Sequence, residues 1–346
     1  MKGQQIGEHG VYRHQLSHHK SGTSRHPPAP KSLAPTNSRR PRRTPLPSIL
    51  YTLSMCRIGG YISPRARVAV IMKSLAALFL PSTLFVTAAL AQQTKPIPYG
   101  SNPAAGKYYA INGFKMYAEV YGSGPPLLMI YGNNGSMNAF EKNVPYFAVH
   151  YTVILADSRS QGKSLDPNHP LTFEVMADDF ATLLDAMHIP SAYVIGWSDG
   201  GINALFLAIR HPEKVKRLAA TGANLWPTAD AFAPGLWDEE KQEYDSGLRK
   251  TYTTAKEKND RKLFLLDWQQ PHITLTQLHT IKAPSLIICG DHDEVSITHT
   301  VLIYQNIPHA NLWVVPNSGH GTLREHSDEF DKQVDEFFTE PFKDLH

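Results

Sequence analysis

The stretch AYVIGWSDGGINALFLAIR, residues 192–210, carries a G-x-S-x-G pentapeptide centred on Ser198. The residues before Gly196 are apolar and suit a buried strand, whereas those after Gly200 suit a helix. A strand, a sharp turn and a helix form the context in which such a serine is an exposed nucleophile. The flanking glycines permit the strained backbone of that turn and a close approach of helix to sheet. The stretch therefore predicts a nucleophilic serine at the carboxyl end of a strand.

Two later segments supply the partners that a nucleophilic serine needs. The apolar run 284–289 is followed by three acidic residues, and the apolar run 311–315 is followed by a glycine-rich loop that contains His320. An imidazole must take the proton of the serine hydroxyl, and a carboxylate must hold the imidazole in the correct tautomer and stabilise its charged form. The order serine, acid, histidine, each after a strand, predicts a catalytic triad.

These segments resemble the α/β-hydrolase superfamily from about Tyr108 to Phe342. Within it, GWSDGGI at 196–202, followed by GAN at 222–224, resembles the valacyclovir-hydrolase (biphenyl-hydrolase-like) group of serine esterases. The resemblance implies an α/β fold, with a mostly parallel central sheet flanked by helices and a small helical cap. It also implies cleavage of a small carboxylic ester, or a related acyl compound, through an acyl-enzyme.

Three residues compete for the role of the triad acid, namely Asp291, Asp293 and Glu294. Relatives usually carry the acid three residues after the glycine that ends the strand, which is Gly290 here. The resemblance therefore implies Asp293, and it leaves the other two as solvated loop charges.

The oxyanion of the acyl-transfer intermediate requires two backbone N–H donors. One belongs to Asp199, directly after the nucleophile, and the other is expected from Asn133, on the loop after the apolar run 127–131. Relatives usually have His-Gly where this chain has Tyr131-Gly132, but a main-chain donor survives that change. We expect Asp199, Tyr131, Asn134 and Trp197 to bind the substrate.

The carboxylate of Asp199 is an unusual neighbour for an oxyanion. At an effective dielectric constant of ~20 and roughly 6 Å, the repulsion amounts to about 3 kcal/mol. A cation can offset it, and there are two candidates: Arg159, in an internal ion pair, or the substrate. In the group that this stretch resembles, the aspartate at this position recognises the α-amino group of amino-acid esters, so the resemblance implies a preference for α-amino esters.

The segment DSRSQGKS, residues 157–164, resembles a turn of the superfamily in which a glycine stands where this chain has Ser160. We expect this turn to be structural. No histidine pair has the spacing of a metal site such as H-E-x-x-H, so neither a metal nor another cofactor is expected.

Strands and helices are predicted to alternate along the chain. A hairpin turns at Asn112-Gly113, and helices and parallel strands follow it. The hairpin strands are expected at 107–111 and 114–121, the parallel strands near 127–131, 151–156, 192–196, 216–221, 284–289 and 311–315, and the helices near 136–149, 172–188, 199–211, 297–306 and 323–339. The aromatic-rich segment of about 225–280 exceeds what a minimal α/β unit needs, and we interpret it as the cap.

The chain before residue 92 differs in character from the rest. Residues 1–71 hold twelve of the 34 basic residues and one of the 31 acidic residues, which leaves 22 basic and 30 acidic residues in the remainder. Residues 72–91 combine a charged start, an apolar stretch and an A-x-A site, which is typical of a signal peptide cleaved after Ala91. Because signal peptides act from an N-terminus, we expect translation to start at Met72. The alternatives are a disordered leader, an organelle transit peptide or a membrane anchor of marginal length.

The predicted domain is thus residues 92–346, acidic and exported to the periplasm or beyond the cell. Its charge does not support nucleic-acid binding, and we expect a small-molecule substrate and no stable membrane insertion after signal cleavage. C–C bond hydrolases and cofactor-free perhydrolases share this fold and triad, so they stay as alternatives, as does a non-catalytic binding protein.

Overall fold

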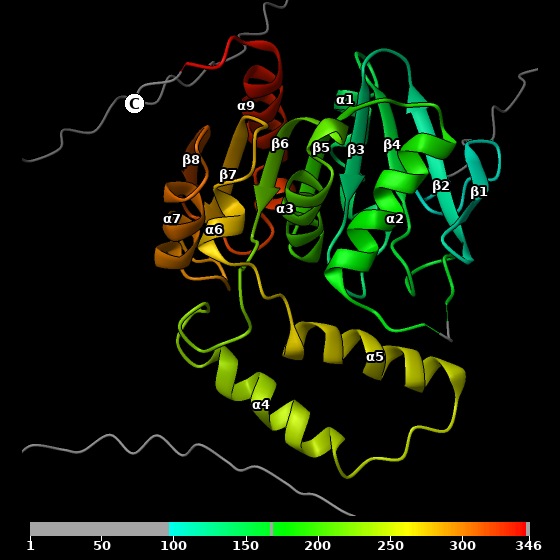
Figure 1. The fold of residues 1–346 in the computed structure, drawn as a ribbon, viewed down its shortest axis with the longest axis vertical. Helices are drawn as coiled ribbons and strands as arrows, with labels where there is room; N and C mark the ends of the chain where they lie inside the picture. Colours follow the sequence, from blue (N-terminus) through cyan, green and yellow to red (C-terminus); the bar gives the residue numbers. More distant parts are fainter. Residues whose placement is uncertain (1–96, 167–168, 344–346) are drawn as a thin grey trace, which may run out of the picture. The chain divides into compact units, whose positions relative to one another are not determined.

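The computed structural model describes residues 97–166 and 169–343, and the sheet in this part of the chain has eight strands. Their order across the sheet is β1-β2-β4-β3-β5-β6-β7-β8, and the first two pairings, β1 with β2 and β2 with β4, are antiparallel. All later neighbours are parallel (Figure 1). The strands are β1 Gly106–Ile111, β2 Phe114–Gly122, β3 Pro126–Ile130, β4 Thr152–Ala156, β5 Ala192–Trp197, β6 Val215–Thr221, β7 Ser285–Gly290 and β8 Ala310–Val315.

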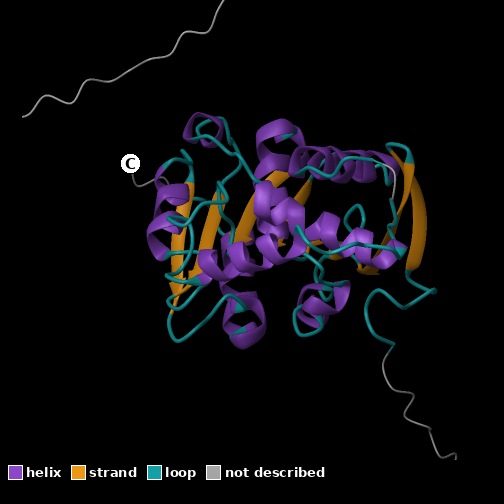
Figure 2. Ribbon diagram, turned by 90° about the horizontal axis from the view of Figure 1, so that it is seen from below, coloured by secondary structure: helices purple, strands orange, loops and turns teal. Residues whose placement is uncertain are grey.

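Helices cover both faces of the sheet (Figure 2). Because side chains alternate along a strand, β3 contributes residues to two hydrophobic cores, one on each face of the sheet. Leu128 and Ile130 pack in the core that contains helices α2 (Phe173–Ala186) and α3 (Asp199–Arg210). Leu127 and Met129 pack in the core that contains helices α1 (Val144–Phe147) and α9 (Ser327–Thr339). Each fully buried aliphatic side chain of this kind contributes about 2 kcal/mol to stability. The fold class predicted from the sequence is confirmed.

The helices connect the strands and follow the apolar periodicity of the sequence. Thr172 caps α2 by accepting the N–H of Val175 at 3.2 Å, and Thr254 and Glu257 form a capping box at the start of α5. The helices are η1 Met137–Phe140, α1 Val144–Phe147, α2 Phe173–Ala186, α3 Asp199–Arg210, η2 Pro212–Lys214, α4 Leu236–Gly247, α5 Ala255–Gln269, α6 Leu275–Leu278, α7 Ile297–Gln305, α8 Thr322–Glu325 and α9 Ser327–Thr339.

Two predicted helices are each divided into shorter ones. The helix expected at 136–149 is η1 followed by α1, because Pro145 has no N–H to donate and its ring opposes continuation from the preceding turn. The helix expected at 323–339 is α8 followed by α9, and the break lies at His326, whose backbone is not helical (φ −124°, ψ 45°).

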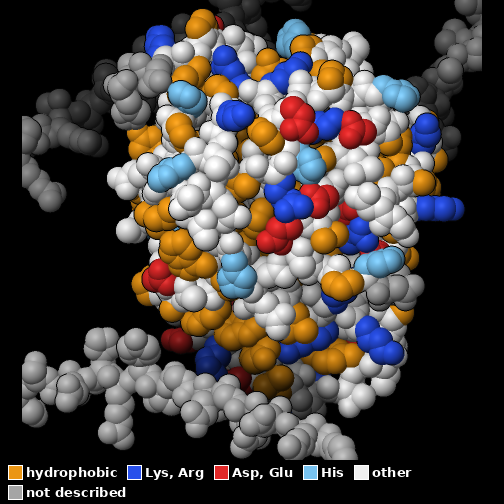
Figure 3. Space-filling model, viewed as in Figure 1, with side chains coloured by type: hydrophobic (Ala, Val, Ile, Leu, Met, Phe, Trp, Pro, Cys, Tyr) orange, Lys and Arg blue, Asp and Glu red, His pale blue; other side chains and the backbone are white. Residues whose placement is uncertain are grey.

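Between β6 and β7 the chain forms α4, α5 and α6, in the segment interpreted as the cap. Helices α4 and α5 lie beyond one end of the sheet (Figure 1). Trp268 of α5 stacks on Trp237 and Tyr244 of α4, at ring-centroid distances of 4.4 and 4.8 Å. Hydrophobic side chains also gather on the outer surface over these helices (Figure 3). Trp237, Tyr244 and Trp268, three aromatic residues of this segment, therefore hold the two helices together.

The expected leader and signal segment, residues 1–91, lie outside the described residues. Within the described ranges, no helix combines the length and the apolar character that a membrane span demands.

Candidate active site

Ser198 lies between β5 and α3 with a left-handed backbone (φ 58°, ψ −123°), which is the strained turn that the sequence predicts. The neighbouring glycines leave no room for a side chain. A Cβ atom on Gly196 would lie 2.2 Å from the carbonyl oxygen of Gly200, and one on Gly200 would lie 1.9 Å from that of Ile130. The turn therefore requires both glycines and presents the serine at the end of the sheet.

The three residues predicted as a triad are within hydrogen-bonding distance in the expected order. Ser198 Oγ lies 2.9 Å from His320 Nε2, and His320 Nδ1 lies 2.7 Å from Asp293 Oδ1. The N–H groups of Gly290 and Val295 donate to the carboxylate of Asp293 at 3.1 and 3.2 Å. The arrangement allows the imidazole to take the serine proton while the buried carboxylate stabilises the resulting charge.

The other two candidate acids lie elsewhere. Asp291 accepts the N–H of Ser318 and bonds to the ring of His292, and backbone N–H groups together with His292 lower its pKa to about 2. Glu294 is exposed, with Oε2 3.9 Å from His320 Nε2. Asp293 is thus the acid that the structure places against the imidazole Nδ1.

His320 is held by contacts on several sides. Burial disfavours its charged form, but the hydrogen bond and the charge of Asp293 outweigh burial and raise the pKa of His320. The indole N–H of Trp197 donates to the carbonyl oxygen of His320 at 2.8 Å. Gly222, with φ 66°, lies so close that a Cβ atom there would approach His320 Cε1 to 2.6 Å. This contact explains the glycine of the GAN segment.

The loop after β3 lies against the nucleophile. A Cβ atom on Gly132 would approach the Cβ of Ser198 to 2.8 Å, so this loop needs glycine to pass the serine. Asn133 follows directly, and its side-chain amide donates to Asp267 Oδ2 at 2.7 Å and to the carbonyl oxygen of Leu263 at 2.9 Å. Asp199 opens α3, where the first N–H groups have no partner within the helix.

Of the four predicted substrate-binding residues, one lines the cavity at the triad and three do not. Asp199 lines a cavity that opens at Ser198 and His320. Tyr131 does not, because it continues the alternation of β3 into the core beside Met129, where its hydroxyl donates to Asp157 at 2.8 Å. Asn134 is exposed and Trp197 binds the backbone of His320, and neither is part of the cavity lining. The substrate-binding prediction is wrong for Tyr131.

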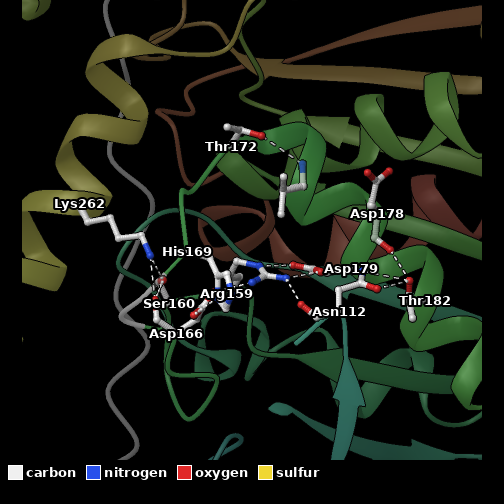
Figure 4. Close-up of polar contacts among 11 residues, drawn as sticks. Asn112, Arg159, Ser160, Asp166, His169, Thr172, Asp178, Asp179, Thr182 and Lys262 are labelled. Atoms are coloured by element: carbon white, nitrogen blue, oxygen red, sulfur yellow. Dashed lines mark hydrogen bonds and ion pairs between the residues drawn. The ribbon is translucent and has the colours of Figure 1, made fainter. Parts of the chain in front are cut away.

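Arg159 does not pair with Asp199. Its guanidinium donates to Asp179 through Nε at 2.6 Å and through Nη2 at 2.7 Å, and it forms an ion pair with Asp166 (Figure 4). All three side chains are buried. Ser160 adopts φ 67°, a conformation that favours the glycine found in relatives. The turn after β4 is a structural network, and the internal ion pair considered for Asp199 is absent from it.

The cavity contains residues that the sequence did not identify individually. Its described lining holds four carboxyl groups and one imidazole, without a lysine or arginine side chain. The carboxyl groups belong to Asp199, Glu240, Asp267 and Glu294. The aromatic residues of the cap segment indicated a pocket wall, and Phe232, Trp237 and Trp268 do line the cavity. No local sequence pattern identified Asp267 or Glu240 as lining residues. In the described ranges, no group of three or more His, Cys, Asp or Glu side chains is arranged to hold a metal ion.

Comparisons with known proteins agree with this geometry. The family model of the alpha/beta hydrolase fold matches residues 125–277. The mouse protein named serine hydrolase BPHL is 24% identical over 268 residues, which cover 71% of this chain and 90% of that protein. The 2-hydroxy-6-oxo-6-phenylhexa-2,4-dienoate hydrolase of Burkholderia cepacia is 25% identical, over 68% of this chain and 97% of that protein.

Among solved structures, the enol-lactonase from Burkholderia xenovorans superimposes with a TM-score of 0.56 at 22% identity, over 68% of this chain and all of that chain. At this identity the likeness establishes the fold alone. The chain has the α/β-hydrolase fold, its residues 125–277 are similar to the alpha/beta hydrolase family, and the chain resembles the biphenyl-hydrolase-like (valacyclovir hydrolase) group of serine hydrolases.

Proposed function

We propose that this protein is an exported serine hydrolase that cleaves small carboxylic esters, with a preference for α-amino esters. The observation that carries the proposal is the unbroken chain from Ser198 Oγ through His320 to Asp293, with contacts of 2.9 and 2.7 Å. Ser198 and His320, two members of this hydrogen-bonded series, line the cavity that the substrate would occupy. Hydrolase activity is common to the relatives that the chain matches.

The chemistry proceeds in two halves. His320 takes the proton of Ser198 as the hydroxyl attacks the ester carbonyl, and Asp293 stabilises the imidazolium that forms. The N–H groups of Asn133 and Asp199 bind the oxyanion, His320 returns the proton to the departing alkoxide, and an acyl-enzyme remains. Water then attacks the acyl-enzyme with His320 again as the base, which releases the acid and restores the serine.

The charge of the cavity favours this substrate class over one alternative. The dienoate named for the Burkholderia cepacia relative carries a carboxylate, which needs a cation in the site. The described lining offers carboxyl groups and no lysine or arginine, so it repels an anion and attracts an ammonium group. Asp199, directly after the nucleophile, is the residue expected to face that ammonium group.

The triad is tested with a fluorophosphonate probe and a chromogenic acetate ester. Ser198→Ala should abolish covalent labelling and lower turnover by about three orders of magnitude or more, because it removes the nucleophile. Ser246→Ala, an exposed serine of α4, is the matched control and should label like the wild type. Undiminished labelling of Ser198→Ala would place the nucleophile elsewhere and remove the basis of the proposal.

The amine preference is tested with alanine benzyl ester and its N-acetyl derivative. The wild type should prefer the free amine by about tenfold, which corresponds to about 1.4 kcal/mol, and Asp199→Ala should lose that preference. If the wild type hydrolysed both esters at equal rates, the proposed amine preference would be wrong, whereas the proposed ester hydrolysis would be unaffected.

A further inference from the structure

Two carboxyl groups, those of Asp199 and Asp267, lie in the wall of the same cavity, where the charge of Asp267 raises the pKa of Asp199. Asp199 comes from the first turn of α3 and Asp267 from the cap helix α5. Asp199 is 4% exposed, whereas Asp267 is partly exposed. Among the described residues, no N–H or hydroxyl group donates to the buried Oδ2 atom of Asp199.

Among the described residues of the cavity wall, the one titratable cation is the imidazole of His320, which is engaged by Asp293. Arg159 is engaged by Asp166 and Asp179 (Figure 4), and no lysine or arginine lines the cavity. Burial raises the pKa of Asp199 well above its usual range, and the negative charge of Asp267 raises it further. Two adjacent carboxyl groups in this environment retain one proton between them when the cavity contains no cation.

The position of Asp267 is set by contacts that hold α5 over the strand ends. The amide of Asn133 donates to Asp267 Oδ2 at 2.7 Å and to Leu263 at 2.9 Å. Further along the helix, Lys262 Nζ donates to Ser160 Oγ at 3.0 Å and to the carbonyl oxygen of Asp166 at 2.8 Å (Figure 4). The helix is therefore attached to the loops after both β3 and β4, and the carboxyl group of Asp267 is held beside Asp199.

We propose that Asp267 is a second specificity-determining residue, and that Asp199 and Asp267 together bind one primary ammonium group of the substrate by accepting N–H bonds from it. This inference rests on the proposed ester hydrolase and adds the cap residue and the class of amine. A primary ammonium group carries a positive charge and three donors, so it can donate to both carboxylates at once and still bond to water or a third acceptor. A trimethylated nitrogen keeps the charge but has no donor.

Binding of the ammonium group exchanges one positive charge for another. The proton shared by Asp199 and Asp267 leaves to solvent as the ammonium group enters, after which both carboxyl groups are ionised. The other titratable groups that face this place are Glu240 of α4, Glu294 after β7, and His320 after β8. Glu240 and Glu294 add negative charge around the cavity, which favours the bound cation.

The test uses four benzyl esters that differ only at the α-carbon: alanine, N,N-dimethylalanine, N,N,N-trimethylalanine and propionate. For the wild type, kcat/KM should fall by about tenfold from the primary amine to the trimethylated one, because hydrogen bonds to charged groups are lost while the charge remains. Asp199→Asn and Asp267→Asn should each reduce that ratio to within about twofold of one, since an amide nitrogen replaces an acceptor by a donor. Glu239→Gln, an exposed residue of α4 outside the cavity lining, is the control and should keep the wild-type ratio.

The outcomes separate the two proposals. No hydrolysis of any of the four esters would contradict the proposed function itself. Hydrolysis of the propionate and alanine esters at similar rates would overturn the role of Asp267 and leave the ester hydrolase intact. The same conclusion would follow if Asp267→Asn kept the wild-type ratio of kcat/KM between primary and trimethylated amine while Asp199→Asn lost it. If Asp267→Asn fails to fold, inhibitors of the wild-type enzyme are compared instead, with the propionate ester as substrate. Alaninol should inhibit hydrolysis about tenfold more strongly than its N-trimethyl derivative. Equal inhibition by the two compounds would overturn the inference.

Discussion

At the residue level, the site depends on a few atoms in strained or crowded places. Ser198 has φ 58°, and this conformation persists because Gly196 and Gly200 let β5, α3 and β3 approach each other. Gly132 and Gly222 lie against Ser198 and His320 respectively, where no Cβ atom fits. The geometry of the triad is therefore as much a property of its glycines as of its three functional side chains.

The assignment of the acid leads to a paired prediction. Asp293→Asn should lower kcat by about 10⁴, because the amide cannot hold the imidazole in the productive tautomer. Asp291→Asn should lower it only mildly, since Asp291 bonds to Ser318 and His292 and not to His320. Steady-state kinetics on a chromogenic ester measure both variants. The reverse order of the two effects would move the role of the acid to Asp291 and leave the enzyme class unchanged.

The pKa of His320 leads to a prediction about pH. His320 must be neutral to accept the serine proton, and Asp293 raises its pKa above the ordinary value of 6.5. The kcat/KM for a neutral ester such as the propionate should therefore rise with pH through an apparent pKa above 6.5 and level off at higher pH. A profile whose rising limb lies below pH 6 would contradict the dominance of Asp293 over burial.

At the level of elements, a buried carboxyl group joins α9 to the loop before α1. Asp331 is 2% exposed and accepts the side-chain N–H of Asn143 at 2.7 Å, and Asn143 also donates to the carbonyl oxygen of Leu323. Burial raises the pKa of Asp331 to about 7, and the hydrogen bond from Asn143 offsets only part of that effect. Because the folded protein then binds a proton that the unfolded chain releases near pH 4, the stabilisation is present at low pH and is lost as pH rises through 7.

This linkage predicts a measurable slope in stability. The free energy of unfolding should fall by about 3 kcal/mol between pH 5 and pH 8 through this one group. Asp331→Asn should remove that contribution, so the difference between variant and wild type should shift in favour of the variant as pH rises. Denaturant titrations at the two pH values provide the measurement, with Glu329→Gln, an exposed residue of the same helix, as the control. A difference independent of pH would show that Asp331 is ionised in the folded protein across this range.

At the level of the whole molecule, the distribution of charge and apolar residues leads to a prediction about export. The basic residues 1–71 precede a stretch with the features of a signal peptide, and the folded part is acidic. When expressed from Met72 in a bacterium, the protein should appear outside the cytoplasm with Gln92 as its first residue. N-terminal sequencing of the exported material checks this. A product that stays in the cytoplasm, or that is exported with residues 72–91 still attached, would contradict the signal-peptide prediction.

The sequence alone was sufficient for the fold class and for the candidate nucleophile and base. Both rest on local patterns: apolar runs that alternate between strand and helix, and the glycine and histidine residues in the turns that follow strands. It was not sufficient for the integrity of helices 136–149 and 323–339, where Pro145 and the conformation of His326 interrupt otherwise suitable patterns.

Only the tertiary structure decided which charges meet. It engaged Arg159 with Asp166 and Asp179, and it turned Tyr131 into the core. It also placed Asp267 of the cap against Asn133, which lies 134 residues earlier in the chain. Contacts between segments so far apart depend on how α5 packs over the ends of the strands, and neither the spacing nor the composition of residues within α5 encodes that position.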